Sequence, residues 1–154
     1  MRLSTKSRYG VRAIFDIAYH SAGLETQVKD ISRRQEISPR YIEQIFQHLK
    51  KAGIIDSKRG PAGGYFLAKK PDEITVGEII RVTEGGIDPV LCLDPEDPDR
   101  LCGRSEECVT RMIWNEAGNR LKEYFDSVTI KDLCEKAQKI GIKKESDQKY
   151  IYYI

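Results

Sequence analysis

Three of the four cysteines have the residue type and spacing to bind a metal centre or to react with oxidants. Cys92, Cys102 and Cys108 follow one another with nine and five intervening residues. Structural zinc sites usually use cysteine pairs two to four residues apart, and this sequence has no such pair. An iron–sulfur cluster accepts wider spacing, because loop backbone can wrap around it, but a cubane needs a fourth ligand. The alternative is three unligated thiols, of which Cys108, at a predicted helix N-terminus, would be the most acidic.

The remaining cysteine and the two histidines give little indication of a catalytic or metal-binding role. Cys134 lies beside Leu133 in the middle of a predicted helix, where packing in the interior is the expected role. His20 and His48 also lie on predicted helices, and neither is next to a cysteine in the sequence. There is no phosphate-binding glycine loop and no metalloprotease motif. A thiol enzyme would need a cysteine and a histidine to meet in space, so we predict that the protein is not an enzyme.

A second set of residues has the chemistry to read DNA. On a helix predicted to begin at Pro39, Glu43 could accept a hydrogen bond from cytosine and Gln44 could pair with adenine. Lys58 and Arg59 lie near the tip of a predicted β-hairpin, from which they could reach phosphates or the minor groove. The alternative is the solvated face of an ordinary surface helix. The polar residues that point away from the apolar stripe are Ser38, Arg40, Glu43, Gln44 and Gln47.

Apolar periodicity and capping signals predict the helices that position these side chains. A first helix is expected from about Ser7 to Ala22 and a second from Val28 to Gln35. Ser38 is a good N-cap and Pro39 suits the first helical position, so a third helix begins there. Gly53 suits the left-handed residue that ends it. Two helices joined by a tight turn predict a helix-turn-helix, and the buried stripe of the third helix is expected to be Tyr41, Ile42, Ile45, Phe46 and Leu49.

A β-hairpin is predicted directly after the third helix. Residues 54–59 and 65–67 read as strands, and residues 60–64 as a turn that needs the positive φ of glycine. The hairpin would form a wing beside the reading helix. Thr75 to Glu78 then read as a capping box that opens a short helix through Thr83.

The rest of the chain divides into a long loop and two helices. Residues 87–107 show little periodicity, and a loop of about 20 residues is too long for a mere connection, so it is expected to be functional. Thr129 caps a last helix from Ile130 to about Ile140. A long amphipathic helix that begins at Cys108 could mediate self-association through an apolar face of Val109, Ile113, Ala117, Leu121, Tyr124 and Val128.

Length and charge limit the kinds of function. A chain of 154 residues allows one compact domain or two very small ones. The net charge of +2 conceals an asymmetry, because residues 1–70 carry 14 Lys/Arg and 6 Asp/Glu whereas residues 71–154 carry 12 and 18. A basic front half suits a polyanion such as DNA. No membrane-spanning stretch and no secretion signal occur, so we expect a cytoplasmic protein without a membrane partner.

These elements predict a mostly α fold with a small β-hairpin wing, that is, a winged helix-turn-helix followed by a long C-terminal dimerisation helix. We expect a DNA-binding domain over residues 1–84 and a cysteine-bearing sensor loop over residues 85–108. Residues 109–154 would hold the dimerisation helix, the last helix and the C-terminal tail.

Three motifs also resemble those of a known family. Residues 1–10 (MRLSTKSRYG), 37–46 (ISPRYIEQIF) and 59–65 (RGPAGGY) are similar to the winged-helix transcriptional regulators that include IscR, NsrR and CymR. The resemblance implies a homodimer, crossed through the long helix, on a partly palindromic site in double-stranded DNA. It implies that Arg59 enters the minor groove. The predicted DNA-binding residues are therefore Arg2, Ser38, Arg40, Tyr41, Glu43, Gln44, Lys58 and Arg59.

Within this family, Cys92, Cys102 and Cys108 are similar to the cluster ligands of the IscR and NsrR branches, which implies a [2Fe–2S] or [4Fe–4S] cluster. Operator affinity would then depend on the cluster or on the thiol state of these cysteines. Arg111 stands where IscR has a histidine ligand, and Arg8 stands where NsrR has an acidic one. The fourth ligand therefore stays open, the candidates being Glu106, Glu107, Cys134 and a small molecule.

The C-terminal sequence indicates an alternative function. Residues 150–154 (YIYYI) are similar to the tail of CymR, a repressor of cysteine metabolism that works with cysteine synthase. The resemblance implies that Tyr153 and Ile154 dock in that enzyme through the terminal carboxylate. An apolar tail that folds back on its own dimer is the competing interpretation.

Overall fold

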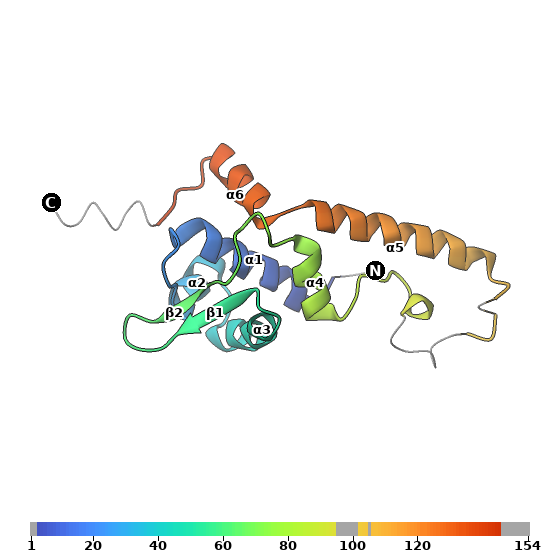
Figure 1. Ribbon diagram of the computed structural model, residues 1–154, viewed down its shortest axis with the longest axis horizontal. Helices are drawn as coiled ribbons and strands as arrows, with labels where there is room; N and C mark the ends of the chain where they lie inside the picture. The colour runs from blue at the N-terminus through green and yellow to red at the C-terminus, as the bar shows by residue number, and fades with distance from the viewer. Residues whose placement is uncertain (1–2, 95–101, 105, 146–154) are drawn as a thin grey trace.

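The computed structural model describes residues 3–94, 102–104 and 106–145 (Figure 1). The predicted contact residues Arg2, Tyr153 and Ile154 lie outside the described residues. The elements are, in order, α1 (Thr5–His20), α2 (Val28–Gln35), α3 (Pro39–Lys51), β1 (Ile55–Lys58), β2 (Gly64–Leu67), α4 (Val76–Glu84), the 3-10 helix η1 (Leu91–Leu93), α5 (Val109–Ser127) and α6 (Ile130–Lys139). The prediction of a mostly α fold with one β-hairpin is confirmed, and we call α1 to α4 with the hairpin the winged-helix module.

Local capping bonds explain where most helices begin. The Ser38 hydroxyl accepts from the backbone N–H of Tyr41 at 3.3 Å, with Pro39 in the first turn, as predicted for α3. Ser4 caps α1 in the same way, so that helix begins two residues before the predicted start at Ser7. At α4, Thr75 accepts from the N–H of Glu78 at 3.0 Å, but the Glu78 carboxylate binds Lys69 and does not complete the predicted capping box.

α1 lies at the centre of the core. It contacts α2, α3, α4 and α6, so helices from both ends of the chain pack against it. On α3 the predicted stripe is buried except for Tyr41, which is half-buried. From α6, Ile130 is buried and Cys134 packs against the same core, where burial raises the pKa of its thiol. The predicted packing role of Cys134 is therefore confirmed.

The hairpin forms the wing, and a third segment supports it. β1 and β2 pair antiparallel, with Ile55 opposite Leu67. Thr26, from the connection between α1 and α2, exchanges two backbone hydrogen bonds of 2.8 Å with Tyr65. In the turn Gly60 has the predicted positive φ of +110°. Gly63 has no positive φ and serves to let the backbones approach, since a Cβ there would lie 2.1 Å from the Lys58 carbonyl oxygen.

α5 is joined to the module at its C-terminal end and extends away from it (Figure 1). Val76 N donates to Val128 O at 2.9 Å, and the Arg81 guanidinium pairs with the Asp126 carboxylate. The one buried residue of α5 is Gly118. Among the described residues no helix is long and apolar enough to cross a membrane.

Candidate DNA-binding surface and cysteine segment

The rotation of α3 is set by its buried stripe, and its polar residues consequently face outward. Ile42, Ile45, Phe46 and Leu49 are 0% exposed. Because a helix repeats every 3.6 residues, the side chains between them lie on the opposite face. The predicted reading residues on that face are exposed, namely Ser38, Arg40, Glu43, Gln44 and Gln47. Their contacts with DNA stay a prediction.

Tyr41 lies at the edge of this surface and is supported by α1. Its ring meets the Tyr9 ring edge to face, with 5.8 Å between centroids and an interplanar angle of 87°. The guanidinium carbon of Arg12 lies 5.2 Å from the Tyr9 ring centroid. Sequence patterns did not single out Tyr9 or Arg12 for this role, since nothing local links them to a residue more than 25 positions away.

The two predicted wing cations differ in their partners. The Lys58 ammonium lies 3.2 Å from the Glu25 carboxylate, so Lys58 already forms an ion pair within the protein. Arg59 is exposed and forms no ion pair within the described part of the chain. Arg59 is thus the wing cation that can reach a phosphate or a groove without breaking an existing pair.

The three cysteines predicted to form a sensor lie on the segment between α4 and α5. Cys92 is half-buried in η1, Cys102 is exposed, and Cys108 is the N-cap residue of α5. A hydrogen bond with the Thr110 hydroxyl, at 3.2 Å, and one with the backbone N–H of Arg111 lower the pKa of the Cys108 thiol. In residues 3–94, 102–104 and 106–145, no three His, Cys, Asp or Glu side chains gather into a group that could hold a metal ion.

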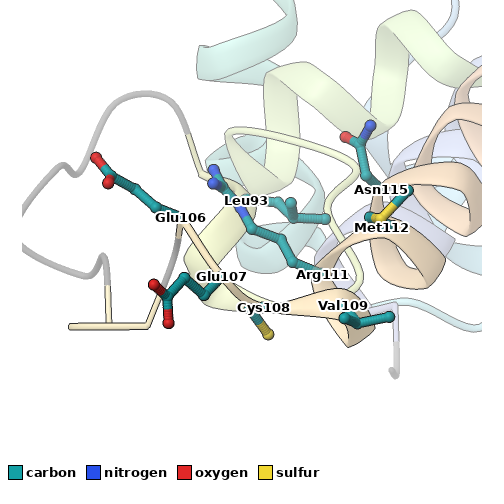
Figure 2. A pocket seen from close by; sticks show the side chains of 8 residues that line it. All are labelled: Leu93, Glu106, Glu107, Cys108, Val109, Arg111, Met112 and Asn115. Atoms are coloured by element: carbon teal, nitrogen blue, oxygen red, sulfur yellow. The ribbon is translucent and has the colours of Figure 1, made fainter.

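A cavity of about 440 Å³ lies where this segment enters α5 (Figure 2). Two candidate fourth ligands, Glu106 and Glu107, line it together with Cys108. Figure 2 shows the Arg111 side chain extending toward Leu93, so residues of η1 and of the start of α5 both line the cavity. The lining residues are Leu93, Glu106, Glu107, Cys108, Val109, Arg111, Met112 and Asn115.

Comparison with known proteins gives matches over most of the chain. The model of the Rrf2 family, described as iron-dependent transcriptional regulator, matches residues 3–136. The protein rrf2 of Nitratidesulfovibrio vulgaris is 42% identical over 137 residues, which cover 89% of each chain. The solved structure of T. potens IscR superposes with a TM-score of 0.74 and 35% identity over 99% of this chain and 97% of that one. That of CymR, described as the global cysteine regulator of B. subtilis, gives a TM-score of 0.71 and 38% identity over 88% and 97%.

Proposed function

Because this chain belongs to the Rrf2 family of transcriptional regulators, we propose that it binds an operator as a homodimer and that its cysteine segment controls the affinity. The predicted kinship with IscR- and CymR-type regulators and the winged-helix fold are confirmed. The relatives are named as regulators, in agreement with the prediction of a non-enzymatic protein.

The observation that carries the DNA-binding proposal is the exposed polar face of α3 beside the basic wing. Glu43 and Gln44 are exposed on a helix whose other face is buried, so they are available to base edges in a major groove. Arg59 is exposed at the end of the hairpin and available to the adjacent backbone or minor groove. A chain that binds chromosomal DNA would act in the cytoplasm.

A test of this function uses the double variant Gln44→Ala with Arg59→Ala. We expect the wild-type protein to retain a defined set of genomic fragments at near-physiological ionic strength, and the double variant to lose most of that retention. Lys139→Ala, an exposed cation on α6, is the matched control and should retain the same fragments. Equal retention by the double variant and the control would contradict the proposal.

Self-association is proposed through α5. Large apolar side chains are exposed along it, with Val109 at 74%, Met112 at 72%, Ile113 at 60% and Tyr124 at 61%. A single chain rarely exposes so many neighbouring apolar residues without a partner. A second copy of α5 would cover them and would set the two reading helices on one face of the duplex.

The donor set of the cysteine segment suits an iron–sulfur cluster, of either the [2Fe–2S] or the [4Fe–4S] type, because thiolates are its preferred ligands. Cys92, Cys102 and Cys108 would hold it, with Glu106 and Glu107 next to Cys108 as available fourth ligands. When bound, a cluster supplies a redox-sensitive centre. The chain's own contribution is to hold Cys108 at the first turn of α5, the helix proposed to join the two protomers. In the alternative without a metal, oxidation of the same thiols would control the affinity for the operator.

Anaerobic purification followed by iron and sulfide analysis tests the cluster. We expect the wild-type protein to absorb visible light and to contain iron and sulfide. Replacing any one of the three cysteines, in Cys92→Ala, Cys102→Ala or Cys108→Ala, should lower the bound iron, whereas Cys134→Ala should keep it. A colourless protein without iron or sulfide would leave only the thiol form of the proposal.

The similarity to a cysteine regulator favours one alternative, in which a partner enzyme controls the protein. Tyr153 and Ile154 would then be bound by cysteine synthase, as the tail resemblance implies. Deletion of Ile154 would abolish co-purification with cysteine synthase under this alternative and would have no effect under the first proposal.

A further inference from the structure

The segment that follows α6 is fastened to the end of α1. The Tyr19 hydroxyl donates to the carbonyl oxygen of Ile142 at 2.5 Å, and the backbone N–H of Glu145 donates to Nδ1 of His20 at 3.1 Å. The Lys144 ammonium lies 5.2 Å from the centroid of the Tyr19 ring. These contacts fix residues 142–145 against the winged-helix module.

The Glu145 carboxylate binds the last turn of α2. Oε1 lies 2.6 Å from Nη2 of Arg33, and Oε2 lies 2.6 Å from Nη1 of Arg34. Burial opposes ionisation of Glu145, but the hydrogen bonds from the two arginines outweigh it and lower its pKa. Arg33 is 58% exposed, so its pair contributes little, whereas the Arg34 side chain is only 10% exposed. The pair with Arg34 is therefore the one that constrains the structure.

Arg34 divides its donors between Glu145 and the buried Asp16. Its Nη2 lies 2.6 Å from Oδ1 of Asp16, and its Nε lies 3.1 and 3.0 Å from Oδ1 and Oδ2. Gln35 Nε2 donates to Oδ2 at 2.8 Å. The Asp16 side chain is 0% exposed, and a buried carboxylate is tolerated only with such a full set of donors. Arg34 and Gln35 are thus held in one geometry.

Further contacts lead from Gln35 to the reading helix. Nε of Arg12 donates to Oε1 of Gln35 at 3.2 Å, and a second guanidinium N–H donates to the Gln35 carbonyl oxygen. Arg12 lies over the Tyr9 ring, which in turn meets the Tyr41 ring edge to face. Tyr41 is in the first turn of α3. The contacts therefore run without a break from the segment after α6 to a predicted DNA-binding residue.

We propose that Glu145 is a positioning residue for DNA recognition, which acts on Tyr41 through Arg34 and the contacts that follow it. The inference rests on the proposed DNA-binding function. Arg34 lies in the last turn of α2, and the left-handed Glu36 (φ +54°) and the N-cap residue Ser38 come directly after that helix. A shift at the end of α2 is passed to the start of α3 because only this short turn separates them. A run of contacts does not by itself show coupling, so the test changes Glu145 and measures the response both in DNA binding and at the start of α3.

The first measurement compares Glu145→Ala with Glu135→Ala, an exposed acid on α6. Both variants lose one negative charge, which by itself strengthens binding to a polyanion. We expect Glu145→Ala to bind a retained genomic fragment roughly three- to tenfold more weakly than wild type, with little change on non-specific DNA. Glu135→Ala should bind as tightly as wild type or more tightly. Glu145→Gln, which keeps one acceptor oxygen, should be intermediate. A mere loss of folded protein would weaken both kinds of DNA binding in proportion.

The second measurement is amide hydrogen exchange without DNA. Faster exchange at Tyr41 and Ile42 is expected in Glu145→Ala and not in Glu135→Ala, because those amides donate to Ser38 in the first turn of α3. Unchanged exchange there, or fragment binding by Glu145→Ala equal to that of Glu135→Ala, overturns the inference. If the wild-type protein does not discriminate between fragments, the proposed function fails, while the exchange result still decides the positioning role.

Discussion

The winged-helix module and α5 bury apolar residues to very different extents. In α3, Ile42 and Phe46 are 0% exposed, whereas in α5 Val109 and Met112 are 74% and 72% exposed. Both helices are amphipathic, so the difference lies in what each one packs against. α3 packs against α1, α2 and α4 and is followed directly by β1. α5 extends away from the module, and its main contacts are with α4 and η1 (Figure 1). A single chain therefore buries the core of the winged-helix module but leaves large apolar side chains of α5 exposed.

The largest expected effect concerns stability and tests the burial of α3 in the core of the winged-helix module. Phe46→Ala should lower the free energy of unfolding by about 3–5 kcal/mol, because it removes a fully buried ring and leaves a cavity. Met112→Ala, in the exposed part of α5, should lower it by less than about 1 kcal/mol. Urea denaturation at low protein concentration measures both values. Similar losses for the two variants would remove the contrast.

The next effect concerns self-association and tests the exposed apolar face of α5. Ile113→Glu should weaken self-association on the order of 100-fold, since a charge without a partner would be buried in the proposed interface. Sedimentation velocity at several concentrations measures the change. Glu116→Gln alters an exposed residue of the same helix and should leave the dimer intact. A wild-type protein that stays monomeric at high concentration would show that α5 is not the interface.

A smaller effect is expected where the two regions join. The Thr129 hydroxyl accepts from the N–H of Asp132 at 3.1 Å, and the Asp132 carboxylate accepts from the N–H of Thr129 at 2.8 Å, a reciprocal capping box at the start of α6. Thr129→Ala should lower the free energy of unfolding by about 1 kcal/mol. Ser127→Ala removes a hydroxyl bonded only within α5 and is the control. A loss in Ser127→Ala as large as in Thr129→Ala would argue against a role of the cap.

The smallest expected effect is a pH dependence within the module. Burial lowers the pKa of His20 below its ordinary 6.5, although Asp16 opposes the shift. The unfolded chain then binds more protons, so stability is full above pH 6.5 and falls as the pH drops below it. Denaturation midpoints should decrease from pH 7.5 to 5.5, and His20→Gln should flatten that decrease. An equal slope in His20→Gln would assign the titration to another group.

Short-range signals predicted the elements of the module well. Ser38 and Pro39 placed the start of α3 correctly, because a cap and a first-turn proline act within three residues. α2 also has its predicted bounds. The missed cap at Ser4 displaced the start of α1, and the three-residue η1 within the long segment was not predicted. A single 3-10 turn leaves no periodicity in a sequence.

Close approaches of the backbone and contacts between distant residues were not predicted. Gly63 is needed because β1 and the turn approach each other closely, which no local pattern reveals. The predicted sensor cysteines are near one another in sequence, yet they form no ligand group with other described residues. Glu145 pairs with Arg34 across 111 positions. The Gly63 approach depends on the conformation of the hairpin turn, and the Glu145–Arg34 pair depends on how the helices pack, so neither follows from residue spacing.

The amino-acid sequence by itself determined the bounds of α2, the start of α3, its polar face, the basic wing and the family, because these depend on periodicity, caps and motifs within a few residues of one another. Only the tertiary structure decided which cation of the wing is already paired, that apolar side chains of α5 are left exposed, and that Glu145, after α6, pairs with Arg34 of α2. Those properties arise from ion pairs and burial between elements, and a buried carboxylate such as Asp16 finds its partners only when the helices that carry them have packed.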